Sequence, residues 1–100
     1  MIQFYNAGAG SGKTYQLTNP HGLSKDGNLL FICDGADGLK VFDATQVEQL
    51  KLIKHVKGLD TYDVIATGNI AIVVEKSGII QFDYSNPSDI KLLSTISWVK

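Results

Sequence analysis

Hydrophobic residues in this chain come in short runs separated by clusters of glycine, asparagine and aspartate. Two runs are apolar at every position, at residues 29–33 (LLFIC) and 70–74 (IAIVV), whereas others alternate between apolar and polar residues. Runs of four to eight residues bounded by turn-forming residues are typical of β-strands, and no segment has a convincing helical pattern. The pattern therefore predicts an all-β protein.

The same pattern occurs twice along the chain. Residues 28–34 (NLLFICD) match residues 69–75 (NIAIVVE) 41 positions later, and residues 38–43 (GLKVFD) match residues 78–83 (GIIQFD) 40 positions later. Within each copy, turn signals divide the sequence into four short strands. A repeat of this length is typical of proteins that stack one small unit several times.

The fully apolar strands at residues 29–33 and 70–74 require cover on both faces, because a sheet with one wet face shows alternation instead. Four-stranded blades packed radially in a β-propeller provide that cover. We therefore predict consecutive four-stranded antiparallel propeller blades, about two to two and a half in this chain. The predicted ranges are 1–17 for a partial blade or outer strands with a Gly/Ser-rich loop, 18–58 for blade one and 59–100 for blade two.

The second copy resembles the LVIVD repeats, in which an apolar strand ends in Asp before a Ser-Asn-Pro-like turn. Residues 78–87 (GIIQFDYSNP) follow that pattern, whereas the first copy has Ala-Thr-Gln-Val at residues 44–47 in place of the turn. The likeness covers residues 18–96. It implies a β-propeller-like bacterial protein, exported or at the cell surface, and it implies no reaction and no catalytic residues.

Two blades cannot close a ring that typically needs four to eight. Their exposed apolar faces favour association. We expect self-association, as in small two-bladed lectins that trimerise into a ring, or the remaining blades of a larger propeller. The predicted function is a non-enzymatic module for binding or scaffolding, with a protein or carbohydrate partner; a purely structural surface repeat is a third interpretation.

The charge and composition of the chain limit the classes of partner that we expect it to bind. The net charge is −1 and all nine basic residues are lysine, so the guanidinium groups that pair best with phosphates and guanine are missing and nucleic acid is not expected. No apolar run approaches the roughly 18 residues of a membrane span. The single cysteine, Cys33, lies in an apolar run and is expected in the core. The start of the chain lacks the pattern of a secretion signal, and the compartment stays undetermined.

A phosphate-loop motif at residues 7–14 (AGAGSGKT) gives the alternative prediction. It resembles the nucleotide loop of DNA helicases of the first superfamily. In a phosphate-loop ATPase or helicase-type fragment, Gly10, Gly12 and Lys13 would hold phosphates and Thr14 would hold magnesium. Such a loop requires a helix directly after it, and Pro20 leaves hardly two turns. We therefore favour a surface loop here and expect no cofactor.

Propellers usually bind through loops gathered on one face. Six residues in one predicted set of loops are candidate ligand-binding residues: His21, Asp34, Asp37, Asp60, Tyr62 and Asp63. His21, Asp34 and Asp37 have metal-ligating side chains, but their spacing is loose and turn formation accounts for the aspartates better. Neither histidine forms a recognisable catalytic arrangement with serine or cysteine, so we predict no catalytic residues and no metal site.

Overall fold

The computed structural model describes residues 3–4, 15–46 and 49–98, and this part of the chain consists of strands and turns. Two short strands come first, β1 (Gln3–Phe4) and β2 (Tyr15–Gln16). The first copy of the repeat forms β3 (Gly22–Asp26), β4 (Leu29–Cys33), β5 (Leu39–Asp43) and β6 (Lys51–Val56). The second copy forms β7 (Thr61–Thr67), β8 (Ile70–Glu75), β9 (Gly78–Asp83) and β10 (Lys91–Ser97).

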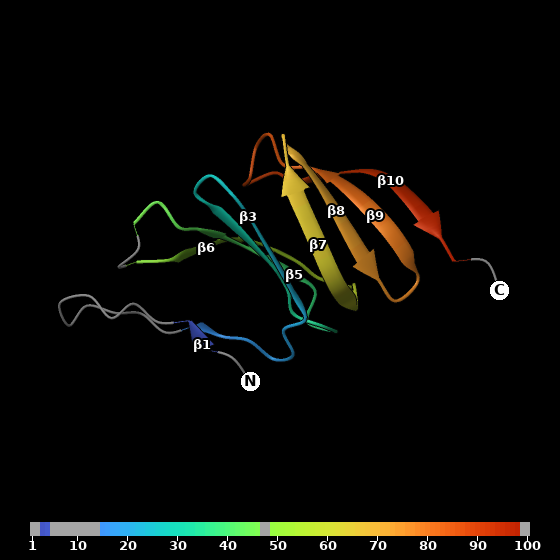
Figure 1. The fold of residues 1–100 in the computed structure, drawn as a ribbon, viewed down its shortest axis with the longest axis horizontal. Helices are drawn as coiled ribbons and strands as arrows, with labels where there is room; N and C mark the ends of the chain where they lie inside the picture. The colour runs from blue at the N-terminus through green and yellow to red at the C-terminus, as the bar shows by residue number, and fades with distance from the viewer. Residues whose placement is uncertain (1–2, 5–14, 47–48, 99–100) are drawn as a thin grey trace.

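Each copy folds into its own antiparallel sheet of four strands, joined in chain order. We call the sheet of β3–β6 the first sheet and the sheet of β7–β10 the second sheet. Figure 1 shows the two sheets side by side, with β3 and β7 at the centre and β6 and β10 toward opposite ends. The predictions of an all-β fold and of two four-stranded antiparallel sheets are confirmed.

The two copies also share their turn chemistry. Asp43 follows the third strand of the first sheet, and its carboxylate accepts the backbone N–H of Thr45 at 2.8 Å. Asp83, its counterpart 40 residues later, accepts the backbone N–H of Ser85 at 2.8 Å. A carboxylate bonded to the amide two residues ahead is the usual turn-forming arrangement for aspartate. The first copy therefore makes the same turn although it lacks the Ser-Asn-Pro sequence.

Glycine is required at one position that the copies share. Gly38 and Gly78 begin or precede the third strand where the fourth strand passes very close. A Cβ atom at Gly38 would lie 2.1 Å from the carbonyl oxygen of Val56, and one at Gly78 would lie 2.0 Å from that of Ile96. No side chain fits at such a distance, which explains the glycine in both copies.

The sheets pack face to face, and the core lies between them. The stacking face of the first sheet, defined by Phe31, Cys33, Leu39 and Val41, is 0% exposed. It packs against the covering face of the second sheet, which consists of Val64, Ala66, Ala71, Val73, Ile80 and Phe82. Phe31 also stacks on Tyr84, with ring centroids 4.7 Å apart. Two apolar faces in contact are the stable arrangement for such sheets.

The outer faces of the two sheets differ. On the first sheet, Ile32 and Phe42 are covered by Leu17 and form a second small core. On the second sheet, cross-strand neighbours Ile65 and Ile72 point outward together with Ile79 and Ile96. Ile65, Ile72 and Ile96 are exposed to solvent. The two central strands of the first sheet are thus covered on both faces, although Leu23 and Leu52 on its edge strands are exposed. The second sheet is covered on one face.

The phosphate-loop motif lies outside the described residues, which exclude residues 5–14. The chain resumes at Tyr15, and Tyr15–Gln16 is strand β2, paired antiparallel with β1. The residues that follow the motif are therefore extended, whereas a phosphate loop needs a helix at this point. In the parts of the chain that the structure covers, no helix is long and apolar enough to cross a membrane.

Candidate functional site

A buried ion network lies at the turn between β4 and β5. The Asp34 carboxylate, fully buried, accepts the backbone N–H groups of Thr18 at 2.9 Å and Asn19 at 2.7 Å. Lys40 reaches it across the turn, with its Nζ 2.8 Å from Asp34 Oδ2 and 2.7 Å from Asp37 Oδ2. The network fastens the segment that contains Leu17 to the first sheet.

The charges in this network stabilise one another. Burial by itself would raise the pKa of Asp34, but the hydrogen bond from Lys40 and the two amides outweigh it and leave that pKa below its ordinary value. The pKa of Asp37 is lowered mainly by its hydrogen bond with Lys40. Burial would lower the pKa of Lys40, yet the two carboxylates raise it above its ordinary value. All three side chains are therefore charged near neutral pH.

A second group of predicted residues gathers where the two sheets meet. The rings of His21 and Tyr62 form an edge-to-face pair with centroids 6.0 Å apart. Asp63 follows Tyr62, and its Cα lies 2.7 Å from where a Cβ of Gly22 would be, which shows how closely the strands approach. His21, Tyr62 and Asp63 are exposed. An exposed aromatic pair beside a carboxylate can stack on a sugar ring or hold a protein side chain.

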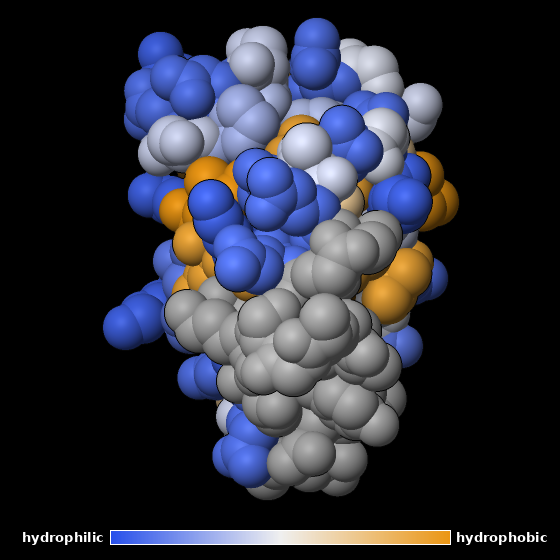
Figure 2. All heavy atoms as spheres, turned by 90° about the vertical axis from the view of Figure 1, so that its left-hand side faces the viewer, coloured by the Kyte–Doolittle hydropathy of each residue, from blue (hydrophilic) through white to orange (hydrophobic). Residues whose placement is uncertain are grey.

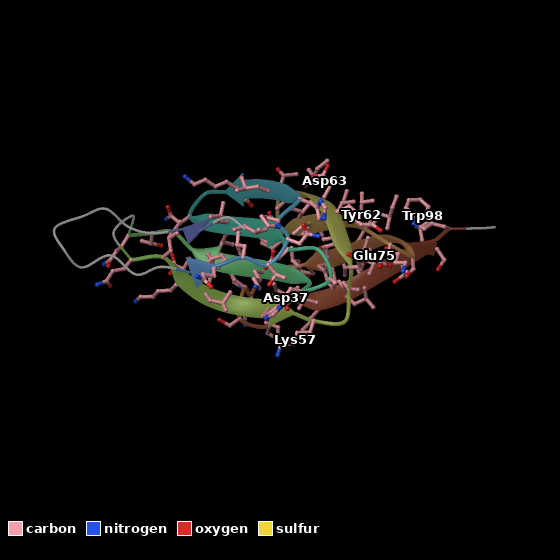
Figure 3. All side chains as sticks on the ribbon, turned by 90° about the horizontal axis from the view of Figure 1, so that it is seen from below. Asp37, Lys57, Tyr62, Asp63, Glu75 and Trp98 are labelled. Atoms are coloured by element: carbon pink, nitrogen blue, oxygen red, sulfur yellow. The ribbon has the colours of Figure 1, made fainter. Side chains whose placement is uncertain are left out.

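The remaining predicted residues lie apart from this group. Figure 3 shows Tyr62 and Asp63 on one side of the molecule and Asp37 on the opposite side. Asp37 is half-buried and its carbonyl oxygen contacts Nε2 of His55 on β6. Asp60 is also half-buried, and its carbonyl oxygen accepts the N–H of Lys76 at 2.9 Å. Five of the six candidates thus divide into an aromatic group and a structural ion network, and Asp60 belongs to neither.

Metal binding finds no support in the geometry. Within the described residues, no three side chains of histidine, cysteine, aspartate or glutamate come together in a way that could hold a metal ion. Asp34 is already saturated by two amides and Lys40, and His21 lies beside Tyr62 instead. The candidate triad of His21, Asp34 and Asp37 is not assembled.

Cys33 lies on the stacking face and is fully buried. Burial raises the pKa of its thiol to about 11, which keeps the thiol protonated near neutral pH. A buried, protonated thiol is a weak nucleophile, so the side chain acts as a small core residue as predicted.

Two contributors to these arrangements were missed by sequence reasoning. Thr61 is fully buried at the start of β7, and its hydroxyl donates toward the carbonyl oxygens of Gly35 at 3.2 Å and Gly38 at 3.1 Å. Its N–H donates to Gly35 O at 2.8 Å, so this residue ties the second sheet to a turn of the first. Lys40 is the other. A threonine after a turn and a lysine in an otherwise apolar strand are the signals that could have drawn attention to them.

The opposite end of the first sheet carries a polar hollow. Its lining comes from the end of β5, the start of β6 and the loop between them, and consists of Asp43, Thr45, Gln46, Gln49 and Lys51. Figure 2 views the molecule from this end, where hydrophilic residues predominate and apolar side chains show in small areas. Asp43 is engaged by Thr45 in the turn described above. None of these five described lining residues is aromatic or buried, so they offer nothing that would select a ligand.

Comparisons of the chain with protein families, with curated proteins and with solved structures found no match. What the described residues define is an architecture, two like four-stranded sheets stacked face to face. The exposed group at His21, Tyr62 and Asp63 and the outer face of the second sheet are the surfaces that this architecture offers to a partner.

Proposed function

We propose that the chain is a non-enzymatic repeat module of the β-propeller type that serves in binding or scaffolding, with further blades supplied by oligomerisation or by additional sequence. The observation that carries the proposal is the stacking of two near-copies through a fully buried face. In the proposed ring, each sheet lies between two neighbours.

The arrangement of the strands agrees with radial blades. The closest approach between the sheets involves β3 and β4 with β7, the first strand of the second copy. Ser24 on β3 accepts the backbone N–H of Ala66 on β7 at 3.0 Å. Figure 1 shows the fourth strands β6 and β10 far apart. In a propeller, likewise, first strands converge on an axis and fourth strands form the outer rim.

The proposed partner surface is the group of His21, Tyr62 and Asp63. These side chains come from the segments that begin the two sheets, and they are exposed. His21 directly precedes β3, whereas Tyr62 and Asp63, which were predicted in a loop, lie at the start of β7. Exposed aromatic side chains at the end of a rigid sheet can bind carbohydrates and proteins. An LVIVD-type module at a bacterial cell surface would present such a group outward.

Binding arrays of glycans and peptides test the partner surface. The purified chain is expected to bind a subset of ligands, and Tyr62→Ala is expected to lose that binding without a change in the β-sheet circular dichroism. Leu92→Ala serves as the control, because Leu92 is also a large exposed side chain (59% exposed against 42% for Tyr62) but lies near the start of β10, where it pairs with Phe82. Equal losses in both variants would contradict the assignment of the surface.

A titration with Mg-ATP tests the alternative function. The proposed module has no tight nucleotide site, so wild type and Lys13→Ala should give the same weak or absent signal. Tight binding that is lost in Lys13→Ala would instead favour the phosphate-loop ATPase and overturn the proposed function.

A further inference from the structure

The second sheet has an apolar outer face, which we call the open face: Ile65, Ile72, Val74, Ile79 and Ile96. Ile65 is 61% exposed, Ile96 55% and Ile72 36%. Their cross-strand pairing places them on one surface, with the uncharged Gln81 beside Ile72. A contiguous patch of isoleucines on a sheet usually marks a contact surface.

The repeat identifies what kind of surface covers this face. Ile72, Val74 and Ile79 occupy the repeat positions of Phe31, Cys33 and Leu39, which form the stacking face of the first sheet. That stacking face is 0% exposed because the covering face of the second sheet lies on it. The open face is therefore a stacking face in the same register that is left exposed.

The hydrogen bonds that link the two sheets can also be compared between the two copies of the repeat. In the first sheet, the turn before β5 offers the carbonyl oxygens of Gly35 and Gly38, and Thr61 donates to both from the start of the next sheet. In the second sheet, Gly78 stands in the position of Gly38. The turn before β9 is shorter, with Lys76 and Ser77 between the paired Glu75 and Gly78, so Gly78 is the one glycine of this link that the second sheet keeps.

In a second copy of this chain, both faces that match the covering pattern already have neighbours. The outer face of its first sheet holds Leu17 against Ile32 and Phe42. The covering face of its second sheet is already occupied by its own first sheet.

We infer that the open face binds another four-stranded sheet of this repeat, which presents small and branched residues equivalent to Ala66, Ala71 and Val73 and a threonine equivalent to Thr61. This inference rests on the proposed function and names the partner of the module. The sheets then stack head to tail, each stacking face receiving the next covering face.

An inserted repeat tests the inference. Val56 pairs with Leu39 as Ile96 pairs with Ile79. A second copy of residues 57–96 can therefore be inserted after Ile96 with the natural connection preserved. The parent for this experiment is the full chain with Cys33→Val and Val74→Cys, which moves the single thiol to the open face, and the inserted copy keeps valine. The readout is the rate of thiol alkylation by iodoacetamide under native conditions.

The expected result is that insertion slows alkylation of the thiol at position 74 by at least about tenfold, because the residue becomes accessible through opening of the stack alone. Ile72→Lys in the original second sheet is expected to restore the faster rate, since a lysine there cannot be buried against an apolar sheet. Sedimentation should show a monomer with and without the insertion.

Equal alkylation rates with and without the insertion would overturn the inference, as would an inserted chain that lacks the β-sheet circular dichroism of its parent. A parent that is dimeric, with a thiol protected in a concentration-dependent way, would also overturn it, since a second copy would then cover the face. If Cys33 of the unmodified chain is protected in the same assay, the proposed stacking module stands even where the inference fails.

Discussion

The two sheets of this protein come from near-copies of one sequence, yet they differ in how much of their surface is buried. Phe31 in the first sheet is 0% exposed, whereas its counterpart Ile72 in the second is 36% exposed. Both lie at the middle of an apolar second strand, so local sequence does not explain the difference. What differs is the neighbour, because the first sheet has one on each face and the second on one.

This comparison teaches that the repeat encodes two stacking surfaces and that position in the stack decides which is used. The covering face carries the small residues Ala66 and Ala71 beside larger ones such as Phe82, and the stacking face carries the large Phe31. Large residues against small ones let two sheets interdigitate at the close packing of protein cores. The variants below break or sharpen the comparison.

The largest expected effect comes from removing the side chain at the centre of the stack. Phe31→Ala should lower the free energy of unfolding by about 3–5 kcal/mol, because it leaves a cavity against Tyr84 and the second sheet. Ile72→Ala, the same repeat position on the open face, should cost about 1 kcal/mol or less. Urea unfolding followed by circular dichroism measures both.

Equal costs at positions 31 and 72 would show that the faces do not differ in burial. A Phe31→Ala chain that fails to fold still leaves the comparison measurable, because Phe31→Leu removes less volume. That variant should cost more than Ile72→Ala.

The next largest effect on stability is expected from the ion network. Among the described residues, it exists in the first sheet alone, because Ile80 stands at the position of Lys40 in the second sheet. Asp34→Asn should lower the free energy of unfolding by about 3 kcal/mol, because Lys40 loses a buried partner. Glu75→Gln, at the corresponding position of the second sheet, should cost less, because Glu75 makes a long 3.4 Å contact with Ser77 and no described ion pair. A larger cost for Glu75→Gln would be inconsistent with this difference.

The same network predicts sensitivity to acid. The pKa values of Asp34 and Asp37 are lowered in the folded chain, so their contribution is present above the unfolded values near 4 and disappears as pH falls through the folded values. Stability should therefore fall below about pH 5. The fall should be shallower in Asp34→Asn, and equal slopes in urea unfolding at several pH values would contradict the lowered pKa of Asp34.

A smaller effect is expected at a link that joins the two sheets. The Tyr84 hydroxyl donates to Asp26 at the end of β3 in the first sheet, and burial together with this carboxylate raises the pKa of Tyr84 to about 12. Tyr84→Phe should cost about 1.5 kcal/mol through the lost hydrogen bond to a charged group. A double-mutant cycle with Asp26→Asn measures the coupling energy between the two side chains. Purely additive effects would show that this hydrogen bond does not contribute to stability.

The smallest effect at neutral pH is expected for Cys33→Val, which installs the residue found at the matching position 74. The change should be less than about 1 kcal/mol. In the wild type, the buried Cys33 thiol has a raised pKa, so the folded state holds its proton more tightly than the unfolded state. The stability that this provides is complete below the ordinary pKa of 9.0 and is lost as pH rises toward about 11. Cys33→Val should therefore lose less stability than the wild type at alkaline pH. An unchanged dependence of the free energy of unfolding on pH in this range would refute the role of the Cys33 thiol.

The sequence predicted the strands well where turn chemistry is local. The strand predicted at residues 29–33 is β4, and the turns at Gly27 and Gly68 have the positive φ of 57° that glycine accepts easily. The contacts of Asp34 could not be predicted, because its partners Thr18, Asn19 and Lys40 meet it through three-dimensional packing. The pairing of His21 with Tyr62 likewise depends on how the two sheets stack, which periodicity along one strand does not specify.

The most direct test of the central claim compares one thiol at the two matching positions. Iodoacetamide should alkylate Cys33 of the wild type at the slow rate of global opening, because the stacking face is fully buried. In Cys33→Val with Val74→Cys, the thiol lies on the open face and should react at least about tenfold faster. Equal rates at the two positions would contradict the account of one buried and one open stacking face.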